Sequence, residues 1–245
     1  MKNIIIIIQA RMGSTRFPGK VMTEIVGYPV LWHIVNRVQC SKLANDIVVA
    51  TSVKRVDDTI EQLCNEMNIN CYRGEELDVL DRYYQAAKIY KAETVVRITA
   101  DCPLVDPFLI DNIIELFTNS ITDFASNVNP PTFPDGYDIE IFSFSALESS
   151  WKNANQKYQR EHVTNYITEN PDRYTSVNFF SLRNLADWRL TIDYVEDIIV
   201  IKKIYQSLYQ PDLIFTLGDV IDFIDSNPKI LNINSKFIDT NRVNQ

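Results

Sequence analysis

The chain has 245 residues, 46% of them hydrophobic, with a formal net charge of −8 at neutral pH and an isoelectric point near 4.9. The acidic balance disfavours a nucleic-acid partner, which needs a basic face, and four cysteines without a C-x-x-C pair beside only two histidines argue against a zinc site or a disulfide framework. No segment has the roughly 18 apolar residues of a membrane span, and the start lacks the features of a signal peptide, so we expect one cytoplasmic domain over residues 1–245 with no membrane partner.

The first predicted element is a buried strand, because Ile4–Ile8 is a run of five isoleucines without polar alternation. Such a run indicates a strand covered on both faces, which is typical of a parallel sheet. Strand-like and helix-like segments then alternate as far as residue 98, which predicts βαβ units and a mostly parallel, doubly wound α/β sheet. We expect strands at 4–8, 47–50, 69–72 and 94–98 and helices at 28–40, 56–67 and 79–90.

Beyond Pro107 the predicted order loosens, so the C-terminal half is expected to be a mixed sheet with helices. We expect helices at 109–117, 146–153, 161–169, 195–208 and 217–224 and strands at 124–127, 137–143, 175–180 and 189–192. The segment Asn127–Gly136 contains three prolines and is predicted to be a loop, with the character of a mobile flap.

The segment directly after the first strand, Gln9–Lys20, has the composition of a phosphate-binding loop. It carries three cations, two hydroxyls and two glycines in twelve residues. Glycines let backbone N–H groups approach an anion, and arginine or lysine neutralises its charge. An ordinary solvated connection is the alternative, but the carboxyl end of a first strand is where open α/β sheets bind ligands. The spacing matches neither the dinucleotide fingerprint nor a Walker A loop.

Two acids follow other predicted strands. Asp101 lies just beyond the fourth strand, where a hard carboxylate suits Mg²⁺ shared with substrate phosphates. Asp193 ends the strand predicted at 189–192, with Glu196 three residues later. Each acid has an alternative role, since Asp101 fits a turn or helix cap and Asp193 with Glu196 fits a capping arrangement.

Several further polar residues are weaker candidates. From the residues alone, Thr51 fits a simple strand-to-helix turn and Arg82 an exposed pair with Asp81. A second set lies in the C-terminal half, where acids on one strand face suit sugar hydroxyls, and a cation and an imidazole suit an acidic sugar. This set of candidate substrate-binding residues is Asp135, Asp138, Glu140, Arg160 and His162. His162 fits a general base or a structural role, and His33 fits helix packing.

The loop resembles, residue by residue, the A-R-x-G-S-x-R-x-P-G-K signature of the sugar cytidylyltransferases, in the branch of spore coat polysaccharide biosynthesis proteins related to CMP-Kdo and CMP-acylneuraminate synthetases. Segments beginning at Arg97, Arg160 and Leu190 resemble the family's R-I-T-G-D-C-P-L, R-E-H-[VI]-T and L-T-[VI]-D-x-P-E-D motifs. Ala100 stands where glycine is usual, and Val195 where proline is usual.

The resemblance implies a Rossmann-like nucleotide-diphospho-sugar transferase fold and assigns roles to the candidates. Catalysis is expected from Arg11, Lys20 and Asp101, and Mg²⁺ binding from Asp101 and Asp193. The expected nucleotide-binding residues are Ala10, Arg11, Gly13, Ser14, Lys20, Thr51, Arg82 and Thr99.

The expected reaction is Mg²⁺-dependent transfer of a nucleotidyl group, CMP from CTP, to a sugar for surface polysaccharide synthesis, with release of pyrophosphate. A glycosyltransferase that uses a nucleotide-sugar donor is the alternative, and a nucleotide-binding regulatory module is a third. The sequence does not identify the acceptor sugar. Its C-terminal aromatic residues suit either a homodimer surface or a mixed-sheet core, so the oligomeric state stays open.

Overall fold

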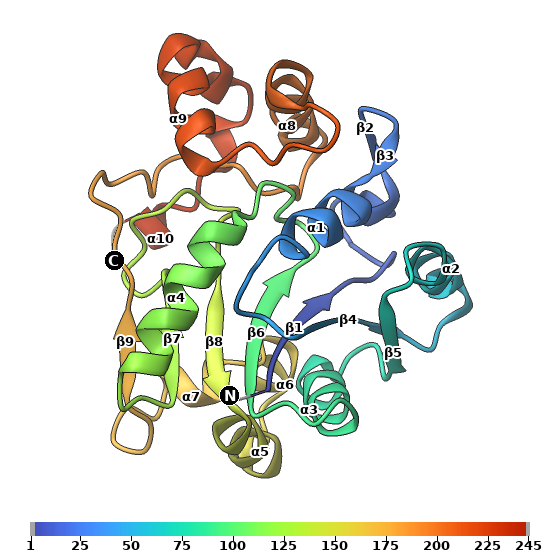
Figure 1. Ribbon diagram of the computed structural model, residues 1–245, viewed down its shortest axis with the longest axis vertical. Helices are drawn as coiled ribbons and strands as arrows, with labels where there is room; N and C mark the ends of the chain where they lie inside the picture. Colours follow the sequence, from blue (N-terminus) through green and yellow to red (C-terminus); the bar gives the residue numbers. More distant parts are fainter. Residues whose placement is uncertain (1–2, 244–245) are drawn as a thin grey trace.

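A seven-stranded sheet in the order β5-β4-β1-β6-β8-β7-β9 forms the centre of the computed structural model, which describes residues 3–243 (Figure 1). β5, β4, β1 and β6 run parallel, β8 is antiparallel to both neighbours, and β7 and β9 pair in parallel. The predicted parallel first half and mixed second half are therefore confirmed. The strands are β1 Ile4–Gln9, β4 Asp46–Ser52, β5 Asn70–Gly74, β6 Thr94–Thr99, β7 Phe124–Ser126, β8 Glu140–Ser143 and β9 Ser176–Asn178.

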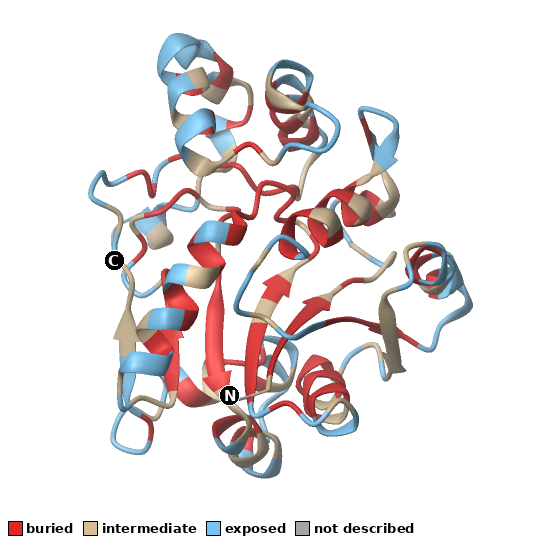
Figure 2. Cartoon of the chain, viewed as in Figure 1, coloured by how far each residue is buried: buried red, intermediate tan, exposed pale blue. Residues whose placement is uncertain are grey.

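Helices cover both faces of the sheet. The helices are α1 Val30–Val38, α2 Asp58–Glu66, α3 Val79–Ile89, α4 Pro107–Asn119, α5 Phe144–Asn153, α6 Lys157–Glu161, α7 Asn165–Thr168, α8 Val195–Leu208, α9 Leu217–Ser226 and α10 Thr240–Val243. Because side chains alternate along a strand, Ile4, Ile6 and Ile8 pack with α1, α2 and α4, while Ile5 and Ile7 pack with α3 and α5. Figure 2 shows the result, with β1, β6 and β8 buried at the centre and the outer helix surfaces exposed.

The strand predicted at 189–192 is wrong. Its backbone amides find partners in two separate loops, since Leu190 donates to the carbonyl of Asp135 at 2.7 Å and Ile192 to that of Asp101 at 2.9 Å. Only an isolated bridge between Asp135 and Arg189 remains, because no single neighbouring strand runs alongside the segment. The segment instead ties the two loops together at the edge where β6 ends.

The helix predicted at 161–169 is also wrong as one element. It is divided into α6 and α7, and the break lies at buried Val163, whose φ of 56° is in the left-handed region. A β-branched residue rarely adopts that conformation, so its apolar sequence pattern does not reveal the break. The strand predicted at 137–143 is shorter than expected, because β8 begins at Glu140.

Two short strands were not predicted, β2 Glu24–Ile25 and β3 Tyr28–Pro29, which form a small hairpin before α1. Short 3₁₀ helices follow α9 at Pro228–Ile233 and Ser235–Phe237. The segment 127–136 is a loop, as predicted, with one internal bridge between Val128 and Pro131 besides the bridge from Asp135 to Arg189. Among residues 3–243, the helices are all too short or too polar to cross a membrane.

Candidate active site

The loop after β1 turns back on itself at the carboxyl end of the sheet. Its turn depends on Gly19, whose φ of 74° is left-handed and whose amide donates to the carbonyl of Met12 at 2.9 Å. The amide of Met12 in turn donates to Oδ1 of buried Asp57 at 2.7 Å. Sequence reasoning missed Asp57, because its contact spans 45 positions and no motif marks it. These backbone contacts hold the loop so that its cations line a cavity.

Lys20 joins the two acids predicted to bind metal. Its Nζ donates to Asp101 Oδ2 at 3.0 Å, to Asp193 Oδ1 at 2.8 Å and to the carbonyl of Ile192 at 2.7 Å. Burial lowers the pKa of Lys20, but the two carboxylates outweigh burial, so the pKa lies above its ordinary value. The ammonium group therefore stays charged, and both carboxylates converge on one point beside the N-terminal loop.

Asp101 is held in its ionised form. Burial raises the pKa of its carboxyl, but Lys20 and the hydroxyl of Thr99 lower it by more, so the pKa lies below its ordinary value. Thr99 Oγ1 donates to Asp101 Oδ1, and the thiol of Cys102 lies 3.5 Å from the same oxygen. Thr99, predicted to bind nucleotide, lines the cavity but uses its hydroxyl here to orient Asp101.

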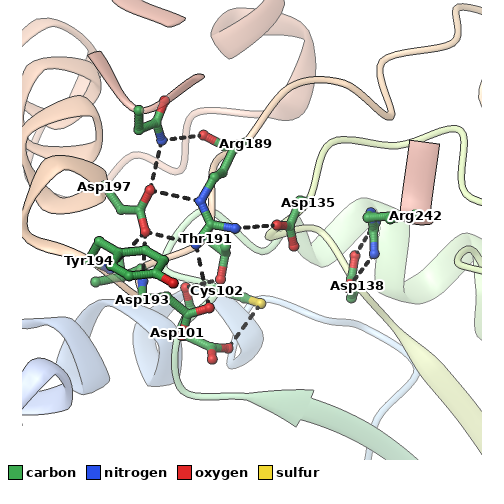
Figure 3. Close-up of polar contacts among 12 residues, drawn as sticks. Asp101, Cys102, Asp135, Asp138, Arg189, Thr191, Asp193, Tyr194, Asp197 and Arg242 are labelled. Carbon is green, nitrogen blue, oxygen red and sulfur yellow. Dashed lines mark hydrogen bonds and ion pairs between the residues drawn. The ribbon is translucent and has the colours of Figure 1, made fainter. Parts of the chain in front are cut away.

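Asp193 is positioned by a buried ion-pair network that the sequence did not reveal (Figure 3). Arg189 donates to both oxygens of Asp197 at 2.9 Å and contacts Asp193 Oδ2 at 3.4 Å. Asp197 Oδ2 also accepts the amides of Asp193 and Tyr194 at 2.8 Å each. Asp197 is fully buried. Asp197, and not the predicted Glu196, therefore makes the capping contacts that fix the loop of Asp193.

A first cavity of about 340 Å³ opens beside the N-terminal loop. The predicted residues that line it are Ala10, Arg11, Ser14, Lys20, Arg82, Thr99, Asp101, His162 and Asp193. Gly13 is not in this lining. A Cβ atom at Gly13 would stand 2.8 Å from Glu76 Oε1, so a larger residue there would displace the end of the Glu76 side chain. The structure thus brings the N-terminal cations to the same cavity as both acids.

Arg82 gives this cavity a buried positive charge. Its Nη1 donates to the carbonyls of Glu75 and Glu76 at 2.9 and 2.8 Å, and its buried Nε has no hydrogen-bond partner among the described residues. Burial, followed by the nearby charge of Arg11, lowers the pKa of Arg82. A polyanion bound in this cavity would stabilise the charged form of Arg82.

A second cavity of about 780 Å³ adjoins the first. The lining residues common to both cavities are Arg16, Thr99, Asp101, His162 and Asp193. The second cavity also contains three predicted acids, each ion-paired to an arginine: Asp135 with Arg189, Asp138 with Arg242, and Glu140 with Arg97. Asp101 and Asp193 therefore lie on the wall between a cavity rich in cations and a cavity lined by paired carboxylates.

Burial raises the pKa of two carboxyl groups that line the second cavity. Burial, reinforced by the neighbouring charge of Asp138, raises the pKa of Asp135 to about 7. Burial likewise raises the pKa of Asp138, against the opposing effect of Arg242. These acids therefore hold protons more readily than exposed carboxyl groups, which suits hydrogen bonding with a polyhydroxylated ligand.

Besides Gly13, two predicted residues lie outside both cavities, Thr51 and Arg160. Thr51 is fully buried in β4, and its hydroxyl has no hydrogen-bond partner among the described residues. Arg160 donates to both oxygens of Asp78 at 2.6–3.1 Å and to the carbonyl of Trp151 at 2.8 Å. Its guanidinium thus joins α6 to the N-terminus of α3. His162, two residues later, lines both cavities.

The residues at the shared wall fit a divalent cation that also binds phosphate. Asp101 and Asp193 supply hard oxygen donors close enough together to contact one ammonium nitrogen. Mg²⁺ is usually bound in proteins by one or two carboxylates, with water and substrate phosphates as further ligands. Among residues 3–243, no group of three or more His, Cys, Asp or Glu side chains is arranged to hold a metal. The pair fits a metal whose remaining ligands come from substrate and water.

The sheet, the cation-lined cavity at its carboxyl end and the two acids define an α/β enzyme of the nucleotidyltransferase class. The chain belongs to the cytidylyltransferase family, whose model matches residues 5–215, and it is an enzyme of that type. It is 43% identical to protein MJ1063 of Methanocaldococcus jannaschii over 95% of this chain and 94% of that one. It is 35% identical to the spore coat polysaccharide biosynthesis protein SpsF of Bacillus subtilis over 93% and 96%. A solved cytidylyltransferase from Leptospira borgpetersenii superposes with a TM-score of 0.90 at 34% identity, covering 94% of this chain and 97% of that chain.

Proposed function

We propose that this cytidylyltransferase transfers CMP from CTP to a sugar acceptor in a Mg²⁺-dependent reaction that releases pyrophosphate. The observation that carries the proposal is the contact of Lys20 with both Asp101 and Asp193 on the wall between the two cavities. The name of the SpsF relative, which refers to polysaccharide biosynthesis, supports a sugar acceptor.

In this proposal the first cavity binds the triphosphate. Arg11, Lys20 and Arg82 contact its oxygens, and Ser14 with the loop amides supplies further donors. Asp101 and Asp193 would hold Mg²⁺, which when bound supplies positive charge that neutralises phosphate oxygens. The cations of the cavity stabilise the charge that gathers on the departing pyrophosphate, so they contribute more in the transition state than in the ground state.

The second cavity holds the sugar in this proposal. Its paired carboxylates accept hydrogen bonds from sugar hydroxyls and orient one of them toward the shared wall. That sugar oxygen forms a bond to the α phosphorus as the bond from phosphorus to pyrophosphate breaks, and the hydroxyl proton passes to solvent water. In this proposal His162 positions the reacting groups, and its place in the lining of both cavities supports that role.

The test is a pyrophosphate assay with each of the four nucleoside triphosphates against 3-deoxy-manno-octulosonate, N-acetylneuraminate and neutral hexoses. We expect pyrophosphate only when CTP, Mg²⁺ and an acceptor sugar are present together. Release of CMP or UDP from a nucleotide-sugar donor, without pyrophosphate from CTP, would instead support a glycosyltransferase.

A further inference from the structure

The second cavity has a wall formed by the end of the chain. Phe237, Asp239 and Arg242 all line it. The family match ends at residue 215, so this wall lies outside the segment that the family model covers. The cation-lined first cavity, by contrast, is built entirely from residues within the matched segment. The family match therefore covers every residue that lines the first cavity but only part of the lining of the second.

The C-terminal segment is firmly attached to the loop that carries Asp193. Asn234 is buried, and its Nδ2 donates to the carbonyl of Arg189 and to Asp197 Oδ1 at 2.9 Å each. The ring of Phe237 stacks on Tyr194 with centroids 3.8 Å apart and planes 4° from parallel. Because the same network positions Asp193, the wall formed by the C-terminal segment has a fixed position relative to Asp193.

Arg242 forms an ion pair with Asp138, which also lines the second cavity. Its Nη1 and Nη2 donate to the two carboxylate oxygens at 2.9 and 2.7 Å, which makes a bidentate pair (Figure 3). The Arg242 side chain is 16% exposed and that of Asp138 is 30% exposed. The buried Nε of Arg242 has no hydrogen-bond partner in the described part of the chain. The bidentate pair uses two of the five guanidinium N–H groups, so the remaining N–H groups of Nη1 and Nη2 and the remaining lone pairs of the carboxylate are left for another partner.

We propose that Arg242 and Asp138 together bind the acceptor sugar, through its hydroxyl or acylamino groups, and so determine which sugar is used. The proposal rests on the proposed function, in which the second cavity is the acceptor site. It assigns acceptor choice to a C-terminal residue and leaves CTP binding to the N-terminal loop. Substitution of Arg242 or Asp138 is therefore expected to change which sugar is bound without changing nucleotide binding.

The test compares the unaltered protein with Arg242→Ala in two binding measurements. Saturation-transfer NMR reports binding of 3-deoxy-manno-octulosonate, N-acetylneuraminate and neutral hexoses, and calorimetry reports the Kd for CTP. We expect Arg242→Ala to weaken sugar binding about 10- to 100-fold, as for loss of a charge-assisted hydrogen bond, while the Kd for CTP changes less than about 2-fold. Lys236→Ala is the matched control, because Lys236 lies in the same segment but pairs with Glu196 at the surface.

A double variant separates sugar binding from a structural role. Asp138→Asn combined with Arg242→Gln keeps neutral hydrogen-bonding groups and removes both charges, so no buried charge is left unpaired. The proposal predicts that sugar binding stays weak in the double variant. Recovered sugar binding in the double variant, or equal binding in Arg242→Ala and the unaltered protein, would overturn it.

The outcomes also distinguish this inference from the proposed function. If the unaltered protein binds a sugar but releases no pyrophosphate, the proposed reaction fails, and the Arg242 result still decides the present inference. If no sugar of the panel binds the unaltered protein, the second cavity is not the acceptor site for these sugars and the inference fails with it.

Discussion

Lys20 Nζ and Asp193 Oδ1 lie 2.8 Å apart although 173 positions separate the two residues in the chain. The contact joins the loop after β1 to the loop before α8, and Lys20 reaches Asp101 after β6 as well. One buried ammonium group thus holds three loops together at the carboxyl end of the sheet. The proposed chemistry depends on this junction, because it places both acids beside the cations of the N-terminal loop.

Replacing Lys20 should abolish most activity while preserving the fold. We expect Lys20→Ala to lower the rate of pyrophosphate release about 10²- to 10³-fold, as for loss of one charge donor at a reacting centre. Lys20→Arg should not restore the rate, because a planar guanidinium cannot replace a compact ammonium among three acceptors. The control is Lys152→Ala, whose exposed pair with Glu148 lies on α5. Near-normal turnover of Lys20→Ala, with unchanged circular dichroism, would refute the role.

Removing Asp197 should destabilise the protein strongly. Asp197 is fully buried and satisfies Arg189 as well as two backbone amides, so Asp197→Ala leaves a buried guanidinium without its main partner. We expect the free energy of unfolding to fall by about 3–5 kcal/mol, measured by urea denaturation. Asp225→Ala, which breaks the exposed pair with Arg183, should leave the urea midpoint unchanged. A small effect at Asp197 would mean that the network is not needed for stability.

His33 should make stability depend on pH. Burial, with the charge of Arg37 as a smaller contribution, lowers the pKa of His33 to about 4, and its Nε2 donates to the carbonyl of Ile25 at 2.7 Å. The unfolded chain takes up this proton near pH 6.5, whereas the folded protein takes it up only near pH 4, so stability from this group falls as pH decreases between the two values.

The expected size of the His33 effect is on the order of 2 kcal/mol between about pH 7.5 and about pH 5. Urea midpoints of the unaltered protein and of His33→Asn, measured at both pH values, isolate it from the titration of carboxyl groups. The decrease on acidification should be smaller in His33→Asn. Parallel decreases in the two proteins would contradict the assignment.

Chelation of divalent metal should stop the reaction reversibly. We expect EDTA to abolish pyrophosphate release and added Mg²⁺ to restore it, because Asp101 and Asp193 are the proposed ligands. Calorimetry should show that Mg²⁺ tightens CTP binding to the unaltered protein and has little effect on Asp193→Asn. Equal tightening in the variant would show that the metal binds through other groups.

Local patterns in the sequence were sufficient to predict the first half of the fold. The run Ile4–Ile8 indicated a strand covered on both faces, and its side chains do alternate between two helix layers. The segment 189–192 was mistaken for a strand because Leu190 and Ile192 are buried apolar residues in alternation. Their amide partners lie in loops more than 50 positions away, and local alternation cannot distinguish such loops from a neighbouring strand.

For the site, motif resemblance grouped Arg11, Lys20, Asp101 and Asp193, and all four line the first cavity. Sequence reasoning missed Arg189–Asp197 and Asp138–Arg242, since each is a tertiary ion pair without a local pattern. Arg160 illustrates the opposite case: its motif neighbour His162 faces the cavities, whereas Arg160 is bonded to Asp78. Because α6 ends at Glu161, between Arg160 and His162, the two side chains point in different directions.

The most direct test of the account is a crystal structure with a non-hydrolysable CTP analogue and Mn²⁺, whose anomalous signal locates the metal. The account predicts the triphosphate in the first cavity, within hydrogen-bond distance of Arg11 and Lys20, and the metal bound by Asp101 and Asp193. A triphosphate located in the second cavity, or a metal bound away from both acids, would contradict it.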